Sequence, residues 1–327
     1  FRGFYLSKHV QQKDVILEET YLFRYFRDVF GNGDAHCPIL ADLLNRIAHL
    51  LQHPDQRSGT IVILRSVLQG TGKTTLNEVL QALIGADWTN FHTDLDSFTG
   101  QFSWHNAFKL VHFIDDVQHC PERLVRSIFS KVTAKAMLFE KKGETPVRID
   151  EYSTLFVTGN DCAVMHCGFE DRRQKIFDAS SLWKGKQAWF DALYAEFEDM
   201  DIMKAWFDYF RERDISDWRP QHDPPNNSKS ETIFQCAPKS HRFIRDCLAS
   251  ELDSYYKTEF HLKVLRNKSI RIRTDTFFNM YKQHINKWYP GSTPRNFNTF
   301  VKEMNTFGIE PSKIRKQFTP TKQYLAV

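Results

Sequence analysis

Residues 61–80, IVILRSVLQGTGKTTLNEVL, constrain the fold of this chain more than any other segment. An apolar, β-branched run ends in a glycine-rich turn, which is followed by Lys73, two threonines and a helical apolar pattern. In such a turn, backbone N–H groups crowd around phosphates, the helix N-terminus adds partial positive charge, and the lysine reaches the terminal phosphates. The segment therefore predicts a phosphate-binding loop within an α/β fold.

The residues of this loop are the expected nucleotide ligands. The first glycine of the usual G-x-x-x-x-G-K-[ST] pattern is replaced by Val67, which bears on the shape and affinity of the loop more than on its chemistry. Thr74 is placed to offer its hydroxyl to Mg²⁺. We expect ATP to be bound by Gln69, Gly70, Thr71, Gly72, Lys73, Thr74 and Thr75.

Two further apolar strands end in polar residues. The run LVHFI is followed by Asp115 and Asp116, and STLFVTG is followed by Asn160. Parallel strands would bring these residues to the carboxyl edge of one sheet, where ligands bind in α/β folds. We expect Asp115 to hold Mg²⁺ through water or Thr74, Asp116 to polarise the attacking water, and Asn160 to orient that water or the γ-phosphate. A lone Asp pair after a strand more often caps a helix, but the order of the three motifs favours an ATPase.

With this order and tight spacing, the chain resembles a superfamily 3 helicase, a branch of the AAA+ ATPases, and especially the helicase part of phage and poxvirus-type primase-helicases. The segment NRIAHLLQHPDQRSGTIVIL resembles that family's lead-in to the phosphate loop. FEKKGETPVRIDEYSTLFVTGN is similar to its DNA-binding hairpin and the strand after it, and EDRRQKIFD to its arginine-finger segment. The resemblance covers about residues 45–178 specifically and the rest of the chain more loosely.

The resemblance implies a hexameric ring that moves along single-stranded or forked DNA in a central pore. It also implies a primase-polymerase region elsewhere in the same polypeptide, and a cytoplasmic location, in the host cell if the protein is viral. An arginine finger acting on a neighbouring subunit would be Arg172 or Arg173, and the spacing to Asp178 favours Arg172. The residues implied as DNA ligands are Lys141, Lys142 and Arg148.

The chain divides by pattern into four parts. Residues 1–57 carry apolar positions at helical spacing and correspond to a helical collar in the resembling helicases. Residues 58–215 alternate strand and helix patterns, as expected for a parallel-sheet ATPase core. Residues 216–236 are predicted to be a linker because they are polar and contain three prolines in the stretch RPQHDPPNNSKS. Residues 237–327 suggest three helices and a terminal hairpin at 317–327, which is a winged-helix-like pattern.

Charge is segregated along the chain. Residues 237–327 hold 17 Lys and Arg against 7 Asp and Glu, whereas the remainder is net acidic. A basic appendage on an acidic body indicates nucleic-acid binding, although a solvated basic surface has the same composition. No apolar run reaches the length of a membrane span. Six scattered cysteines indicate free thiols in a reducing compartment, and a metal site at Cys162, His166 and Cys167 is the weaker interpretation.

Two other functions fit the same motifs. A P-loop nucleotide kinase would share the phosphate loop but would need neither a basic hairpin nor a basic C-terminal part. A DNA-binding replication scaffold could carry Val67 as the mark of a weakened ATP site. The chain begins with Phe, so we expect it to be a fragment of a longer protein.

Overall fold

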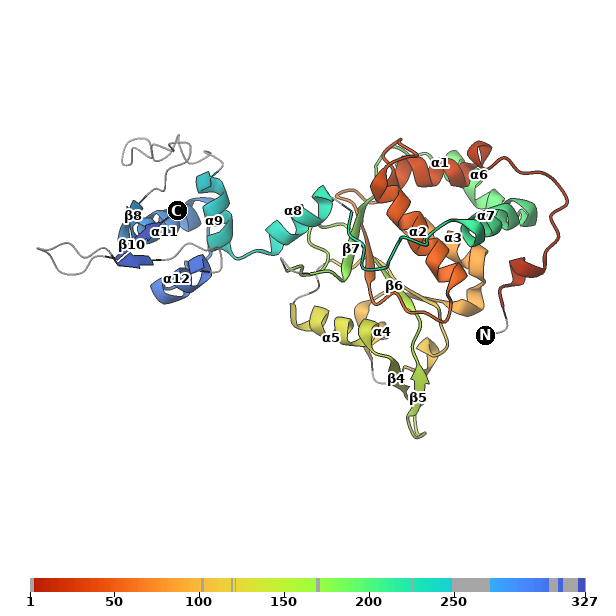
Figure 1. Cartoon of the computed structure of the whole chain (residues 1–327), viewed down its shortest axis with the longest axis horizontal. Coiled ribbons are helices and arrows are strands. Elements are labelled where there is room, and N and C mark those ends of the chain that lie inside the picture. The colour runs from red at the N-terminus through yellow and green to blue at the C-terminus, as the bar shows by residue number, and fades with distance from the viewer. Residues whose placement is uncertain are drawn as a thin grey trace, which may run out of the picture. The chain divides into compact units, whose positions relative to one another are not determined.

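The computed structural model describes residues 3–100, 103–118, 120, 122–168, 171–224, 226–248, 271–305, 311–313 and 323–326. Contacts divide the chain into two units, Phe1–Cys236 and Ala237–Val327, each with its own core (Figure 1). No helix in these described ranges is long and apolar enough to span a membrane.

The first unit is built on a parallel sheet of five strands in the order β2-β3-β6-β1-β7. The segment with the glycine-rich turn supplies the strand β1, which pairs with β6 on one side and β7 on the other. Every residue of β1 is buried, which explains the apolar run Ile61–Leu64 that precedes its last residue, Arg65. The strands are β1 (Ile61–Arg65), β2 (Thr89–His92), β3 (Val111–Ile114), β6 (Thr154–Gly159) and β7 (Gln174–Asp178).

Helices cover both faces of this sheet. Alternate residues of β1 enter two separate apolar clusters, because successive side chains of a strand point to opposite faces. Val62 and Leu64 belong to the larger cluster, and Ile61 and Ile63 to the smaller one. The larger cluster includes α1 (Tyr21–Tyr25), α2 (Pro38–Gln52), α3 (Thr75–Ile84), α6 (Gln187–Phe197) and α7 (Met200–Glu212). The smaller cluster includes α4 (Leu95–Thr99) and α5 (Glu122–Thr133).

Residues 1–57, predicted as a collar subdomain, pack into the larger cluster together with the sheet and are therefore part of the first unit. They form α1, a π-helical turn η3 (Phe26–Phe30), α2 and the short turns η1 (Tyr5–Lys8) and η2 (Leu17–Glu19). Two further short turns, η4 (Ala86–Trp88) and η5 (Trp104–Asn106), flank β2 and β3. Pro38 at the first turn of α2 suits its missing N–H and fixed φ.

The predicted linker differs from the structure. Residues 227–236 form the helix α8 (Asn227–Cys236), and the backbone before it is tied to the core. The guanidinium of Arg46 donates to the carbonyl oxygens of Pro220 and His222 at 3.0 and 3.2 Å. The sequence pattern does not indicate this packing. A polar stretch with prolines and without apolar periodicity can still be held by hydrogen bonds to its backbone carbonyl groups.

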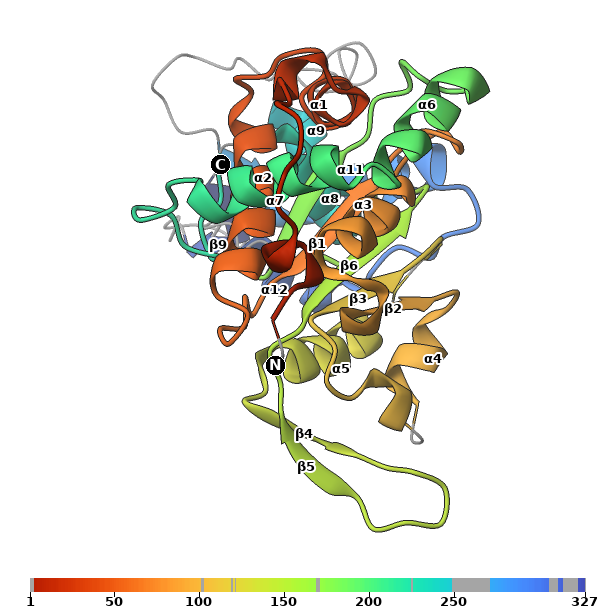
Figure 2. The same ribbon diagram turned by 90° about the vertical axis from the view of Figure 1, so that its right-hand side faces the viewer.

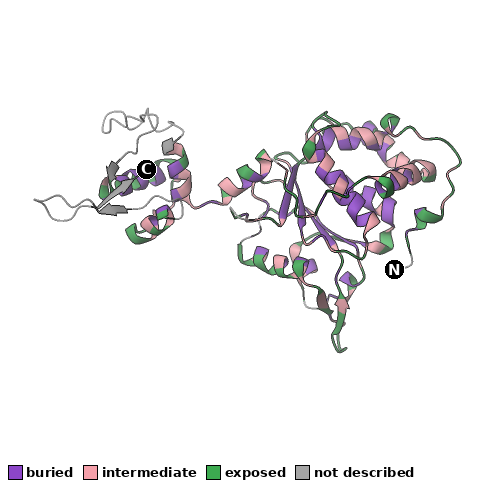
Figure 3. Cartoon of the chain, in the orientation of Figure 1, coloured by how far each residue is buried: buried purple, intermediate pink, exposed green. Residues whose placement is uncertain are grey.

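A two-stranded antiparallel hairpin leaves the first unit between the second and third motif strands. It consists of β4 (Ala136–Phe139) and β5 (Val147–Asp150). Figure 2 shows it projecting beyond the sheet and its helices, and Figure 3 shows its far end exposed. The main sheet is buried in the same view.

In the described residues of the second unit, the elements follow the order helix, strand, helix, helix, strand, strand. Its antiparallel sheet has the order β8-β10-β9, and its core is rich in aromatic rings. The predicted hairpin at 317–327 is only partly described: β10 pairs with residues 311–313 and 271–273, and residues 317–322 and 327 lie outside the described ranges. The elements are α9 (Lys239–Leu248), β8 (Arg271–Arg273), α11 (Thr274–Trp288), α12 (Phe297–Asn305), β9 (Pro311–Lys313) and β10 (Gln323–Ala326).

A buried ion pair within α2 also anchors the chain after α7. Arg46 and Asp42 are 2.9 Å apart, with side chains 3% and 4% exposed, and Asp42 also accepts a hydrogen bond from Nε1 of Trp218. Asp42→Ala would leave the buried guanidinium without its counter-charge. We expect it to lower the free energy of unfolding by about 3–5 kcal/mol, measured by urea unfolding followed by tryptophan fluorescence. Asp14→Ala, at an exposed position, is the control and should change it by less than about 0.5 kcal/mol. An equally small effect of Asp42→Ala would show that Asp42 is not the counter-charge on which the buried Arg46 depends.

Candidate functional site

The turn between β1 and α3 is shaped by two glycines and contacted by two aromatic side chains of the hydrophobic core. Gly70 and Gly72 have φ angles of +71° and +88°, which only glycine adopts without strain. The hydroxyl of Tyr25 donates to the carbonyl oxygen of Gly72 at 2.9 Å, and a Cβ added to Gly72 would lie 3.0 Å from the ring of Phe190. The turn is therefore fixed in place by the hydrophobic core.

Val67 and Gln69 lie in the exposed part of the same turn. Val67 is 75% exposed and does not have a positive φ, so a side chain is tolerated where the motif has its first glycine. Gln69, predicted as a nucleotide ligand, is also exposed and does not line the pocket described below. The loop thus takes its shape from Gly70 and Gly72.

Lys73 is a buried cation surrounded by neutral oxygen atoms. Its side chain is buried, and Nζ donates to Oγ of Ser66 at 2.6 Å and to Oδ1 of Asn160 at 2.9 Å. Burial lowers the pKa of Lys73, against the opposing effect of the nearby Asp115 and Asp116. The two nearby carboxylates offset part of the cost of burying this cation, and an anion bound beside the ammonium group would offset more.

The two aspartates are joined through a residue that the sequence analysis did not identify. Asp115 Oδ1 accepts hydrogen bonds from Oγ1 of Thr74 at 2.9 Å and from Oγ1 of Thr158 at 2.5 Å. The same Thr158 oxygen accepts the backbone N–H of Asp116 at 2.9 Å. Asn160 Nδ2 donates to Oδ1 of Asp116 at 2.7 Å. Hydrogen bonds therefore connect the turn after β1 with the ends of β3 and β6.

Asp116 has a strained backbone. Its φ of 50° is unusual for a residue with a side chain. The bonds from Thr158 and Asn160 hold the residue in this conformation, which aims its carboxylate at Asn160 rather than back along the chain. Strain of this kind is found where the surrounding structure fixes a functional group.

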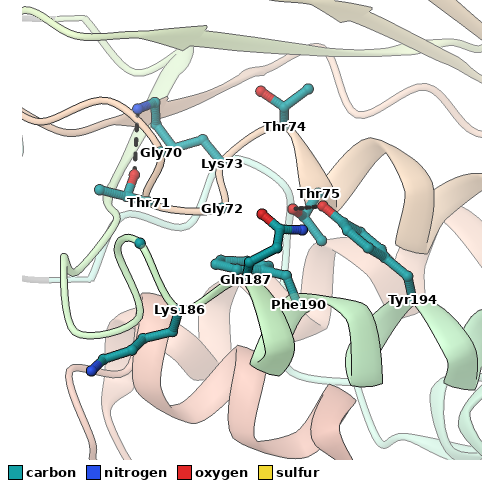
Figure 4. A pocket seen from close by; sticks show the side chains of 11 residues that line it. Gly70, Thr71, Gly72, Lys73, Thr74, Thr75, Lys186, Gln187, Phe190 and Tyr194 are labelled. Carbon is teal, nitrogen blue, oxygen red and sulfur yellow. Dashed lines mark hydrogen bonds between the residues drawn. The ribbon is translucent and has the colours of Figure 1, made fainter.

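A pocket of about 380 Å³ opens beside the turn (Figure 4). One wall is the turn itself, residues 70–75. The other wall comes from a distant part of the sequence, α6 and the two residues before it, which no motif marks. Its residues are Gly185, Lys186, Gln187, Phe190 and Tyr194.

The pair Arg172 and Arg173 lies at the opposite end of the sheet. The carbonyl oxygen of Arg173 accepts the N–H of Ile61 at 2.8 Å, at the amino ends of β7 and β1. Arg172 is exposed, and the guanidinium of Arg173 packs 5.1 Å from the centre of the Phe129 ring. The Asp171 carboxylate accepts the backbone N–H of Arg173. Within one chain, neither arginine is near the pocket.

The hairpin carries the three predicted DNA ligands. Lys142 and Arg148 are exposed. Lys141 is half-buried: its Nζ lies 4.3 Å from the centre of a Trp104 ring and 3.6 Å from Oε2 of Glu144. Gly143, with φ of +82°, forms part of the turn. Lys141 therefore braces the hairpin, and Lys142 and Arg148 are the more available cations.

The structure does not support a metal site at Cys162, His166 and Cys167. Among the described residues, no group of three or more His, Cys, Asp or Glu side chains is arranged to hold a metal. Burial raises the pKa of Cys167 to about 12, so this thiol stays protonated.

Among the comparisons with known proteins, solved structures of one protein region share the fold of this chain. A family model described as "Family of unknown function (DUF5906)" matches residues 64–173, and the search among curated proteins found no match. Three apo structures of the NrS-1 C-terminal region, two of them described as residues 305–718, share 14% identity with this chain. They cover 100% of it and 79–80% of their own length, with TM-scores of 0.74–0.76. A JCV helicase structure gives a TM-score of only 0.38 at 11% identity, over 75% of this chain and 64% of its own, and carries no weight.

The two glycines of the turn allow a matched test. Gly70→Ala would meet no atom within 4 Å, so only the positive φ opposes it, at a cost of roughly 1–2 kcal/mol. Gly72→Ala has the same backbone cost and also crowds Phe190, which should add about 1–3 kcal/mol. We expect Gly72→Ala to lower the urea midpoint further than Gly70→Ala. Equal midpoints would show that Phe190 does not support the turn.

Proposed function

We propose that this chain is the ATP-dependent DNA helicase motor of a viral, phage or plasmid replication protein, of the superfamily 3 branch of the AAA+ ATPases. One observation carries the proposal: Lys73, Asn160 and Asp116 form a continuous hydrogen-bonded chain beside a pocket lined by a phosphate-loop motif. Phosphoryl transfer requires little beyond positioned charges of this kind. The fold shared with the NrS-1 C-terminal region agrees with it.

Thr74 and Asp115 would hold Mg²⁺. Their hydroxyl and carboxylate oxygens, 2.9 Å apart, are the hard ligands that this ion prefers. Bound there with ATP, Mg²⁺ would neutralise charge on the β- and γ-phosphates. Lys73 would add positive charge at the same phosphates, Asp116 would accept a proton from the attacking water, and Asn160 would orient that water.

Two substitutions test the proposed roles. Lys73→Ala should reduce ATP hydrolysis by on the order of 100-fold or more, because the cation at the phosphates is lost. Asp116→Asn is nearly isosteric and should keep nucleotide binding while stopping turnover. Phosphate release and ATP titration calorimetry would measure the two effects. Full hydrolysis by Asp116→Asn would contradict its role, and phosphate transfer to a nucleotide acceptor without stimulation by DNA would favour a kinase.

DNA binding is proposed for the β4–β5 hairpin. It extends from the first unit, is exposed at its far end and carries cations there (Figures 2 and 3). In a ring with single-stranded DNA in its pore, Lys142 and Arg148 would contact phosphates. Lys141, packed on Trp104, would keep the hairpin in place.

The hairpin has a matched test. Lys142→Ala with Arg148→Ala should leave DNA-independent ATP hydrolysis nearly unchanged and remove stimulation by single-stranded DNA. The exposed lysines 8 and 184, also changed to alanine, give a control with the same loss of charge. ATPase rates with and without DNA, and unwinding of a forked duplex, are the measurements. Wild-type unwinding by the hairpin variant would exclude it as the translocating element.

The remaining parts of the proposal concern the oligomer, the second unit and the rest of the polypeptide. We propose a homo-hexamer in which Arg172 or Arg173 reaches the γ-phosphate of a neighbouring subunit, since neither lies near its own pocket. The basic second unit, residues 237–327, would bind DNA as a winged-helix-like domain. The helices of its described residues and their three-stranded antiparallel sheet support that interpretation. A primase-polymerase region of the same polypeptide and a cytoplasmic location complete the proposal.

A further inference from the structure

We propose that the α6 wall of the pocket, made by Gln187, Phe190 and Tyr194, receives the nucleoside of the bound nucleotide, that is, its ribose and base. This inference rests on the proposed function and assigns the half of the site for which the sequence contains no motif. The phosphate loop alone would bind any polyphosphate, so the α6 wall is what makes the substrate a nucleotide.

The orientation of the nucleotide follows from the positions of the catalytic groups. Asp115, Asp116 and Asn160 are joined to Lys73 and Thr74 but do not line the pocket. The reacting phosphate must lie beside them. The pocket extends from the turn in another direction, toward α6, and the amine of Lys73 points away from Gln187 and Tyr194 (Figure 4). The end of the nucleotide remote from the reaction must therefore face α6.

The contact between the two walls lies next to the start of α3. Oγ1 of Thr75 and the hydroxyl of Tyr194 are 3.1 Å apart. Thr75 is the last residue that the turn contributes to the pocket and the first residue of α3. A nucleotide passing out of the turn would meet the Tyr194 ring next. Burial raises the pKa of Tyr194, so its hydroxyl remains neutral.

The chemistry of the α6 wall suits a nucleoside and not another phosphate. Phe190 forms an apolar floor under Gly72, Tyr194 offers an aromatic ring with a hydroxyl, and Gln187 offers an amide. Lys186 is the cation of this wall, and its side chain extends away from the other three in Figure 4. Apolar surface with a few placed polar groups is typical of sites that bind bases and sugars.

Gln187 is held in position for this role. It is exposed at the first turn of α6, and its Nε2 donates to Oδ1 of Asp191 one turn further on at 2.8 Å. That bond leaves Oε1 as an acceptor for a donor group on the base or ribose. The side chain is therefore oriented without being part of the hydrophobic core, so its removal should not affect folding.

The test compares two ligands that share only the phosphates. The full 327-residue chain is titrated with ATP and with inorganic tripolyphosphate, both with Mg²⁺, by calorimetry. Gln187→Ala should raise the Kd for ATP about 3- to 10-fold, as expected for a lost hydrogen bond. Tyr194→Leu should raise it about 10-fold through lost stacking, and Tyr194→Phe should stay within about 2-fold of wild type. The Kd for tripolyphosphate should change less than about 2-fold in all three.

Controls separate this inference from the proposed function. Gln56→Ala removes an exposed glutamine that does not line the pocket and should affect neither ligand. Equal losses for ATP and tripolyphosphate in Gln187→Ala and Tyr194→Leu would show that the α6 wall only supports the loop, and would overturn the inference. So would unchanged ATP binding in both variants. A wild-type chain that binds neither ligand would instead overturn the proposed nucleotide site itself.

Discussion

The arrangement of the site depends on the hydrogen bond between Lys73 and Asn160. It joins the turn after β1 to the end of β6 across 2.9 Å, and Asn160 continues the connection to Asp116 after β3. The three residues are distant in sequence, and the parallel sheet places them together because parallel strands end at one edge. The nearby carboxylates of Asp115 and Asp116 offset part of the cost of burying this lysine. The fold therefore maintains a buried positive charge at the place where phosphates would bind.

The hydrophobic core sets the shape of the loop as directly as the glycines do. Tyr25 and Phe190 approach Gly72 from α1 and α6, which are far apart in the sequence. The N-terminal helices and α6 are consequently part of the site although they carry none of its motifs. This explains why residues 1–57 pack into the larger core and do not stand apart from it.

The sequence predicted what depends on local pattern and strand order. The β1–turn–α3 segment, the two later strands and the meeting of Lys73, Thr74, Asp115, Asp116 and Asn160 follow from apolar runs that end in polar residues. The same reasoning could have identified Ser66, which follows β1, and Thr158, which lies near the end of β6. A hydroxyl next to a carboxylate pair is a weak signal, however, because Ser and Thr occur in most strands and turns.

The rest could not be read from the sequence because it depends on contacts between distant segments. The α6 wall meets the turn through Phe190 and Tyr194. From the sequence, an aromatic residue at helical spacing indicates a position in the hydrophobic core as well as it indicates a position that lines a pocket. The partial burial of Lys141 depends on Trp104, which belongs to another loop. The helix α8 was mistaken for part of a linker because its polar sequence is held by specific bonds and not by an apolar face.

Arg65 shows how that helix is connected to the site. Its side chain is 4% exposed and pairs with Asp178 at the end of β7 and with Glu231 of α8. It also donates to the carbonyl oxygen of Cys162, two residues beyond Asn160, at 2.6 Å. One buried guanidinium thus ties together the strand that precedes the phosphate loop, the loop that carries Asn160, and the last helix of the first unit. Because an unpaired buried charge is unfavourable, these segments cannot separate without leaving Arg65 uncompensated. A displacement of the loop that carries Asn160 would therefore disturb the contact between Arg65 and α8.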